Sequence, residues 1–172
     1  MTVYICYNYT IICNGCKGKD KQMYERKQGQ PYHTNRHSCY LLQYHLVLVT
    51  KYRHPVIDGV VKTCLYSRIR GIFNKRGLNI LELNGEPDHV HILFEADPFT
   101  CPGELVNVLK TQTSKFVRQA YGETLLKKWY WKPYFWSESY FITTVSENSL
   151  ANVEEYIKNQ GTKEHSPTPK QA

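Results

Sequence analysis

The sequence contains no long hydrophobic run, and this absence is the first limit on what the protein can be. No apolar stretch approaches the roughly 20 residues that a membrane-spanning helix needs. The N-terminus also lacks the charged start and the apolar core of a secretory signal peptide. We therefore expect a soluble, cytoplasmic protein with no membrane partner. Its 172 residues, of which 41% are hydrophobic, suffice for one domain with a proper core.

Paired cysteine motifs are also scarce. The chain has six cysteines, which should remain thiols in a reducing cytoplasm. Cys13 and Cys16 have the C-x-x-C spacing of half a zinc knuckle, but no second C-x-x-C and no matching histidine pair follow. The sequence thus gives a zinc site little support, and Cys64 falls in an apolar helical pattern that is typical of a core position.

Acidic residues are too few to balance the basic ones. The net charge is +7, and 14 tyrosines, six phenylalanines and three tryptophans accompany it. A positive surface favours a polyanionic partner, and aromatic rings among basic residues suit unstacked bases. Nucleic acid is therefore the first candidate partner. The alternative is that the tyrosines fill the core and edges of a small domain.

The chain divides into three parts by composition. Residues 1–36 are tyrosine-rich, then polar and basic, and show no periodicity long enough to build a core, so we expect a partly flexible N-terminal extension. Met23 is a second candidate start, which would make some of residues 1–22 dispensable. Residues 37–161 form the predicted domain. Residues 162–172 are polar and contain proline, as in a disordered tail.

The predicted domain has a β-α-β-β-α-β order followed by a final helix. Strands are expected at residues 39–53, 78–85, 89–96 and 140–145, and helices at 58–77, 101–122 and 146–160. Asp58 and Gly77 are the expected caps of the first helix. The second helix should end just before Gly122, with Leu105, Leu109, Phe116 and Ala120 as its apolar stripe. This order predicts an α+β, ferredoxin-like fold, with two helices on one face of an antiparallel sheet and residues 89–96 in a central strand.

The segment EPDHVHILFE places two histidines one residue apart in a strand. Because side chains alternate along a strand, His89 and His91 share one face, while Val90, Ile92 and Phe94 point to the core. Two imidazoles on one face make half of a metal site. Two half-exposed histidines on a sheet face are the alternative.

The final helix contributes a second pair of polar residues. Leu150, Val153 and Ile157 form its apolar stripe, and Tyr156 and Gln160, four residues apart, lie on one face. Taken alone, Tyr156 is better explained as a boundary residue that packs its ring.

Three segments in the right order resemble one family. QYHLVLVTKYR, EPDHVHILFE and SYFITTVSENSLANVEEYIKNQ are similar to the motifs of the small single-tyrosine HUH transposases, the TnpA-like enzymes of insertion sequences that move as single-stranded DNA. The resemblance runs from about Ser38 to Gln160 and does not cover residues 1–22. It implies a prokaryotic, DNA-associated protein.

The resemblance implies a role for each matching residue. His89, His91 and Gln160 would be the protein ligands of a divalent metal, Mg²⁺ or Mn²⁺, and Tyr156, on the extra C-terminal helix, would be the catalytic nucleophile. The enzyme would cleave and rejoin single-stranded DNA with terminal hairpins through a 5′-phosphotyrosine intermediate. It would act as a homodimer in which His89 and His91 of one subunit meet Tyr156 and Gln160 of the other.

Two alternatives stay open at this point. A domesticated relative that processes repeated palindromes would use the same catalytic residues. A non-catalytic ferredoxin-like module that binds RNA or DNA would explain the charge and the aromatic residues without the histidine pair. A histidine-triad hydrolase is disfavoured because Leu93 stands where its third histidine would be.

Several further residues are candidates for contact with DNA or for support of the site. The basic residues could contact DNA phosphates or could simply be solvated surface charges. They are Lys51, Arg53, His54, Lys110, Lys115 and Arg118. The segment KKWYWKPYFW mixes cations and rings, which suits a single strand or a packed aromatic cluster. Asp88 could orient a histidine or be a simple turn residue, and His45 could approach DNA or, as we slightly favour, pack within its strand.

Overall fold

The structure is a computed structural model that describes residues 32–34 and 37–160. The Cys13–Cys16 motif, Met23 and the predicted tail at 162–172 lie outside these residues. Within the described part of the chain, no helix is both long and apolar enough to cross a membrane.

The centre of the protein is a four-stranded antiparallel sheet. Its strands are β3 (Leu42–Val49), β4 (Asn79–Asn84), β5 (His89–Ala96) and β6 (Phe141–Thr144), in the spatial order β4-β5-β3-β6. The predicted ferredoxin-like α+β fold is confirmed, with the histidine-bearing strand β5 at the centre of the sheet beside β3.

The first predicted strand was too long. A separate strand, β2 (Cys39–Tyr40), precedes β3, and a short 3₁₀ turn, η1 (Lys51–Arg53), follows it. Tyr52 and Arg53 have positive φ angles of 61° and 53°. This left-handed backbone is sterically costly for residues with a side chain and cannot continue a strand.

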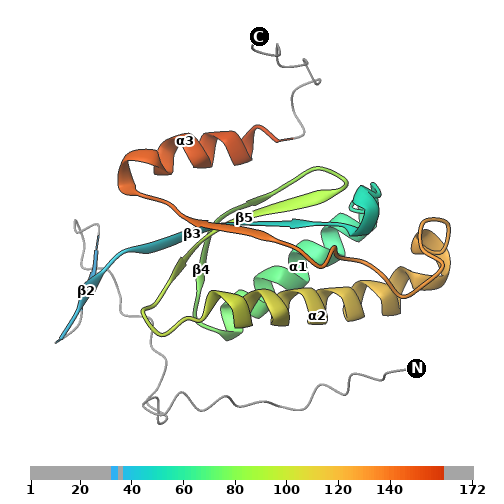
Figure 1. The fold of residues 1–172 in the computed structure, drawn as a ribbon, viewed down its shortest axis with the longest axis horizontal. Coiled ribbons are helices and arrows are strands. Elements are labelled where there is room, and N and C mark those ends of the chain that lie inside the picture. Colours follow the sequence, from blue (N-terminus) through green and yellow to red (C-terminus); the bar gives the residue numbers. More distant parts are fainter. Residues whose placement is uncertain (1–31, 35–36, 161–172) are drawn as a thin grey trace.

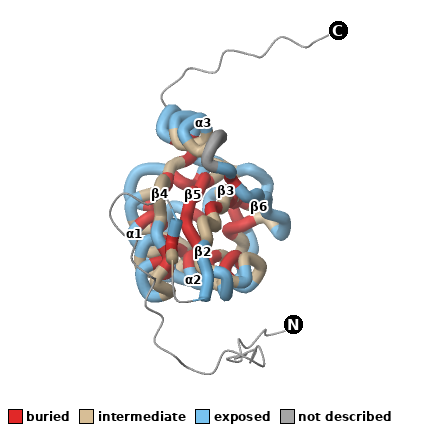
Figure 2. Tube along the Cα trace, turned by 90° about the vertical axis from the view of Figure 1, so that its left-hand side faces the viewer, coloured by how far each residue is buried: buried red, intermediate tan, exposed pale blue. Residues whose placement is uncertain are grey.

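Helices cover both faces of the sheet (Figure 1). α1 (Gly59–Lys75) and α2 (Pro102–Tyr121) lie on one face, and α3 (Glu147–Lys158) lies on the other. β5 is buried along nearly its whole length (Figure 2). Its residues Val90, Ile92 and Phe94 join the main core with α1 and α2, whereas His89, His91 and Leu93 point to the α3 side, as strand alternation requires.

The predicted boundaries of α1 agree with the structure. The Asp58 side chain accepts a hydrogen bond from the Gly59 amide at the N-terminus. At the other end Gly77, with φ of 65°, follows the C-cap Arg76, and the amides of Gly77 and Leu78 donate to the carbonyls of Asn74 and Phe73. This pattern is a Schellman motif, in which glycine tolerates the left-handed residue.

The α-helix α2 ends at Tyr121, as the position of Gly122 predicted, but the chain keeps a helical path beyond this glycine. Gly122 has helical angles, and the chain continues into one turn of π-helix, η2 (Gly122–Leu126). The buried positions of α2 include Thr113 and Val117, whereas Phe116 is 42% exposed and Ala120 is also exposed. The core-facing side of the helix therefore runs through Leu109, Thr113 and Val117, which are four residues apart. The prediction named Phe116, one residue before Val117.

A small hairpin stands before the sheet. β1 (His33–Thr34) pairs with β2, so the boundary that the sequence suggested at residues 36 and 37 falls between its two strands. His33 is buried, with its Nε2 3.6 Å from Oε2 of Glu95, which is buried in β5. Glu95 also accepts hydrogen bonds from Gln43 and Asn79. The buried carboxyl group of Glu95 therefore has polar partners within the chain.

Candidate active site

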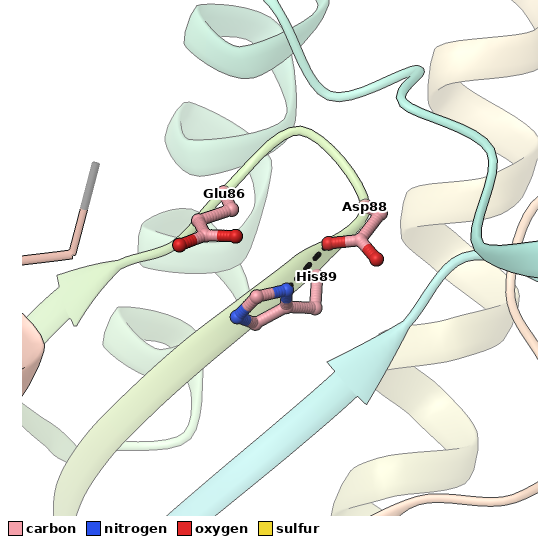
Figure 3. Close-up of side chains that lie close together, drawn as sticks. All are labelled: Glu86, Asp88 and His89. Atoms are coloured by element: carbon pink, nitrogen blue, oxygen red, sulfur yellow. Dashed lines mark hydrogen bonds and ion pairs between the residues drawn. The ribbon is translucent and has the colours of Figure 1, made fainter. Parts of the chain in front are cut away.

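His89 stands at the start of β5, where the β4–β5 turn brings it next to two acidic residues (Figure 3). Its Nδ1 lies 2.6 Å from Oδ1 of Asp88. Arg53, held by the left-handed turn after β3, donates through Nε to Oδ2 of the same carboxyl group at 2.8 Å. Burial alone would raise the pKa of Asp88, but the His89 hydrogen bond and the charges of His89 and Arg53 lower it. Asp88 is therefore an ionised group that orients His89.

His91 is the buried member of the pair. Its Nδ1 lies 2.8 Å from Nε2 of His45 on the neighbouring strand β3. Its Nε2 is buried and has no hydrogen-bond partner among the described residues. Burial, followed by the charges of His89 and His45, lowers the pKa of His91 to about 4, so the ring is neutral at physiological pH.

Helix α3 brings Tyr156 to His91 within a single chain. The two ring centroids are 5.6 Å apart and the rings are perpendicular. Ile157, the next residue, is fully buried against Leu93 and Val145, and Leu150 and Val153 pack on the same small cluster, as the helical periodicity predicted. Tyr156 itself is 54% exposed. The helix thus holds the phenol beside His91 and leaves it exposed to solvent.

Gln160 lies beyond the end of α3. The sequence placed it on the same helix as Tyr156, but α3 ends at Lys158, and Gln160 follows in a turn. Asn84 donates from Nδ2 to the carbonyl oxygens of Ile157 and Gln160, and Asn84 pairs with His91 in the sheet. The chain therefore brings the Gln160 backbone to the strand residue beside His91.

The donor atoms in this region suit a divalent cation. Both histidines use Nδ1 for a contact with a neighbouring side chain, which is the usual way in which a metal-binding histidine is oriented to offer Nε2. The buried Nε2 of His91 has no hydrogen-bond partner among the described residues and can serve as a ligand atom. The residues present therefore fit a metal ion.

Glu86 is a candidate ligand that the sequence analysis overlooked. One ligand atom from each of Glu86, Asp88 and His89 lies within 4.8 Å of the others, and Figure 3 shows the three side chains converging at the turn before β5. The sequence could have indicated this residue, because Glu86 is an acidic residue three positions before His89 in the same predicted hairpin.

The six basic candidates for DNA contact mostly have partners within the chain. Arg53 binds Asp88 as described, Lys51 Nζ lies 2.9 Å from Oε1 of Glu138, and Lys110 Nζ donates to the Glu138 carbonyl. Arg118 donates to the Tyr134 carbonyl, and the His54 ring contacts the rings of Trp129 and Tyr130. Lys115 is exposed. Most of these residues therefore also fix the segment at 128–138 against η1 and α2.

That aromatic segment has a buried and an exposed part. Tyr130, Phe135 and Trp136 belong to the core, and the indole of Trp136 donates to the Thr113 hydroxyl. Trp131 is 78% exposed, with Nζ of Lys132 4.4 Å from its ring centroid. The segment is thus a packed aromatic cluster that presents Trp131 and its lysines to solvent.

Comparisons with known proteins agree on one family. Residues 38–160 match the family described as IS200-like transposases. The chain is 37% identical to the ISDra2 transposase TnpA of Deinococcus radiodurans over 140 residues, which cover 81% of this chain and 94% of that protein. It is 30% identical to the transposase of insertion sequence element IS200 from Salmonella typhimurium, over 72% of this chain and 80% of that protein.

Solved structures give the same result at the level of the fold. A crystal structure of a protein from Deinococcus radiodurans R1 superposes with a TM-score of 0.61 and 35% identity, covering 74% of this chain and 96% of the other. A REP-associated tyrosine transposase bound to a REP hairpin superposes with a TM-score of 0.53 at 12% identity, over 73% of this chain and 72% of that chain.

Proposed function

Because the chain belongs to the family of IS200-like transposases, and is therefore a DNA-processing enzyme, we propose that it cleaves and rejoins single-stranded DNA at insertion-sequence ends. The proposed intermediate is a 5′-phosphotyrosine at Tyr156, and the reaction depends on a divalent metal, Mg²⁺ or Mn²⁺. The proposed location is the prokaryotic cytoplasm, where the DNA is.

One observation carries this proposal: Tyr156 lies with its ring 5.6 Å from that of His91, whose buried Nε2 has no partner among the described residues. A weak nucleophile thus stands beside a donor atom that a cation would satisfy. Because Tyr156 is 54% exposed, its phenol is accessible to DNA at this place.

His89 and His91 would hold the metal through Nε2, and Gln160 would add its amide oxygen, with Glu86 as a further candidate. Bound there, the ion would polarise a phosphoryl oxygen of the DNA and so favour attack on the phosphorus. The neutral imidazole of His91 suits this role because it leaves the charge of the ion available to the phosphate. Asp88 and Arg53 keep the His89 ring in place.

Tyr156 would make and break one bond in each step. Its oxygen forms a bond to phosphorus while the bond from phosphorus to the 3′ oxygen breaks. The phenol loses its proton and the departing 3′ oxygen takes one up, which yields a 5′-phosphotyrosine and a free 3′-OH. Attack by a second 3′-OH reverses the exchange, joins a new strand and regenerates the phenol, so no ATP is required.

The proposed substrate is a single strand that carries a terminal hairpin. The net charge of +7 and the exposed Trp131 and Lys132 support binding of a flexible polyanion with unstacked bases. Lys51, Arg53, His54, Lys110, Lys115 and Arg118 remain the proposed phosphate contacts; the pair of Lys51 with the largely exposed Glu138 is one that a phosphate could replace.

We propose that the protein acts as a homodimer, because two tyrosines can hold two DNA ends. α3 is attached to its sheet through a small cluster of side chains, so the same contacts could be made with the sheet of a second copy. Mixing Tyr156→Phe and His91→Ala proteins tests whether sites are shared. Adduct formation by the mixture shows a shared site, and its absence shows that each site belongs to one chain.

A denaturing gel with Mn²⁺ and a labelled single strand tests the chemistry. We expect a band shifted by one protein mass with the 3′-labelled strand, and no such band with the 5′-labelled strand. Tyr156→Phe should still bind DNA but form no adduct, whereas the exposed Tyr140→Phe control should form it as the wild type does. His91→Ala should lose metal and cleavage together. Binding without an adduct at every metal tried would favour the non-catalytic nucleic-acid-binding module instead.

A mobile element is favoured over a domesticated, palindrome-processing relative. The relatives with at least 30% identity are transposases of insertion sequences, whereas the REP-associated protein is 12% identical. Transposition of a marked element flanked by its own ends, in cells that supply the protein, would test this choice.

A further inference from the structure

His45 touches His91 in a way that ordinary strand packing does not explain. The two side chains are diagonal neighbours, because His45 pairs with Leu93 and Val47 pairs with His91. Their ring planes differ by 19°, and Nε2 of His45 lies 2.8 Å from Nδ1 of His91. With the centroids 5.1 Å apart, the rings meet edge to edge through this hydrogen bond rather than face to face.

Only one hydrogen can occupy the contact between the two nitrogens. The two nitrogens are 2.8 Å apart, so one of them must donate the hydrogen and the other must accept it. In one arrangement Nδ1–H of His91 donates to Nε2 of His45, and Nε2 of His91 keeps a free lone pair. In the other, Nε2–H of His45 donates, and the hydrogen of His91 is on Nε2.

The surroundings of His91 separate these two arrangements. Its Nε2 is buried without a hydrogen-bond partner among the described residues. A hydrogen there would be a buried donor with nothing to accept it, and it would block a metal as well. An unshared lone pair at the same place is what a metal ligand needs.

We propose that His45 is a positioning residue that holds His91 in the Nδ1–H tautomer and so directs the Nε2 lone pair into the metal site. Asp88 gives His89 the equivalent support through Nδ1 at 2.6 Å. Each histidine of the pair then has its own orienting partner, one from the turn before β5 and one from β3. The link between this tautomer and metal binding rests on the proposed function. The tautomer itself can be observed without metal or DNA.

Two substitutions separate a polar role of His45 from a packing role. His45→Phe keeps a flat ring beside Phe141, whose centroid is 6.5 Å from that of His45, but it offers no acceptor to His91. His45→Gln loses the ring but can place Oε1 near the position of Nε2. Thr143→Val, at the exposed position that pairs with His45 on β6, is the matched control.

The first measurement is ¹⁵N NMR of the imidazole nitrogens in metal-free protein near pH 8, with the His91 signals assigned by their absence in His91→Gln. We expect the Nδ1–H tautomer for His91 in wild type, in His45→Gln and in Thr143→Val. We expect its loss in His45→Phe, either to the Nε2–H form or to a mixture. An Nε2–H tautomer in wild type, or an unchanged tautomer in His45→Phe, would overturn the inference.

The second measurement is Mn²⁺ affinity by calorimetry, with circular dichroism to verify that each variant is folded. Loss of an orienting partner typically weakens metal affinity by about 10–100-fold. We expect a weakening of that size in His45→Phe, with recovery in His45→Gln. Equal weakening in both folded variants would overturn the inference in favour of packing. If wild type has the Nδ1–H tautomer but binds no metal, the proposed function fails and the assignment of the tautomer remains.

Discussion

At the scale of single residues, the environment of His91 is the most informative feature of the site. The side chain is 5% exposed, and burial is the main reason why its pKa falls from 6.5 to about 4. The folded protein therefore prefers neutral His91, which is also the form that can bind a metal. Protons and metal compete for this ring only in acid.

The shifted pKa of His91 predicts a pH-dependent contribution to stability. Between pH 6.5 and about pH 4 the unfolded chain binds a proton at this residue and the folded chain does not. The free energy of unfolding should therefore fall as the pH is lowered through this window, and this contribution should be fully present above it. Urea denaturation at several pH values, with EDTA present, should show a weaker dependence for His91→Gln than for wild type. If the free energy of unfolding depended on pH equally in the two proteins, His91 would not have a lowered pKa in the folded state.

At the scale of elements, the turn between β4 and β5 fixes where the histidine strand begins. A side chain on Gly85 would place Cβ 2.2 Å from the carbonyl oxygen of His89 and 2.8 Å from Cα of Val90. Both are backbone atoms that can move only if the strand moves. Glycine is therefore required at this position for the close approach of the two strands.

Gly85→Ala should destabilise the protein and disturb the site together. Forcing additional atoms into a packed region typically costs about 1–3 kcal/mol, and here the shift would displace His89. Gly71→Ala in α1 is the matched control, because a Cβ there meets nothing within 4 Å and alanine favours a helix by roughly 0.5–1 kcal/mol. Thermal denaturation should lower the Tm of the first variant and raise that of the second. A Tm for Gly85→Ala equal to that of wild type would show that the turn relaxes freely.

Among the described side chains of α3, Ile157 is the buried one that attaches the helix to the sheet. Ile157 is fully buried, and only a small cluster surrounds it. Loss of a buried isoleucine side chain usually costs about 2–5 kcal/mol, which is enough to release a short helix of this kind.

Ile157→Ala should therefore uncouple DNA binding from cleavage. With α3 released, Tyr156 would leave His91, so adduct formation should decrease at least tenfold, while affinity for the DNA hairpin should remain within a few-fold. Hydrogen exchange of the α3 amides should increase in this variant and not in Asn152→Ala, which changes an exposed residue of the same helix. Equal protection of α3 in both variants would exclude this explanation.

At the scale of the whole molecule, the net charge of +7 predicts a strong dependence of DNA binding on salt. For single strands the slope of log affinity against log salt is about −0.7 for each phosphate that is neutralised. Fluorescence anisotropy between about 50 and 200 mM salt should show a steep fall. Removal of the exposed Lys115 by Lys115→Ala should make the slope shallower by about that amount. A slope unaffected by this substitution would remove Lys115 from the contact surface.

The fold and the histidine pair were accessible from the sequence because they depend on local periodicity. The alternation in β5 and the order of elements predicted the central strand with His89 and His91 on the face opposite the core. The contact between His45 and His91 could not be predicted, because it depends on the register of β3 against β5, which no local pattern sets. The left-handed turn at Tyr52 and Arg53 was missed for a related reason, since neither residue favours it intrinsically.

Alternate residues of strand β5 lie on two faces with different environments. Val90, Ile92 and Phe94 stabilise the main core, and His89 and His91 face the side of α3, where we propose the active site. Evolution can therefore change the histidine-bearing face by point substitution while the opposite face continues to specify the same domain. A single-residue deletion within the strand would be far more damaging than most substitutions, since it would exchange the two faces beyond that point. We expect natural variation along this strand to consist of replacements rather than insertions or deletions.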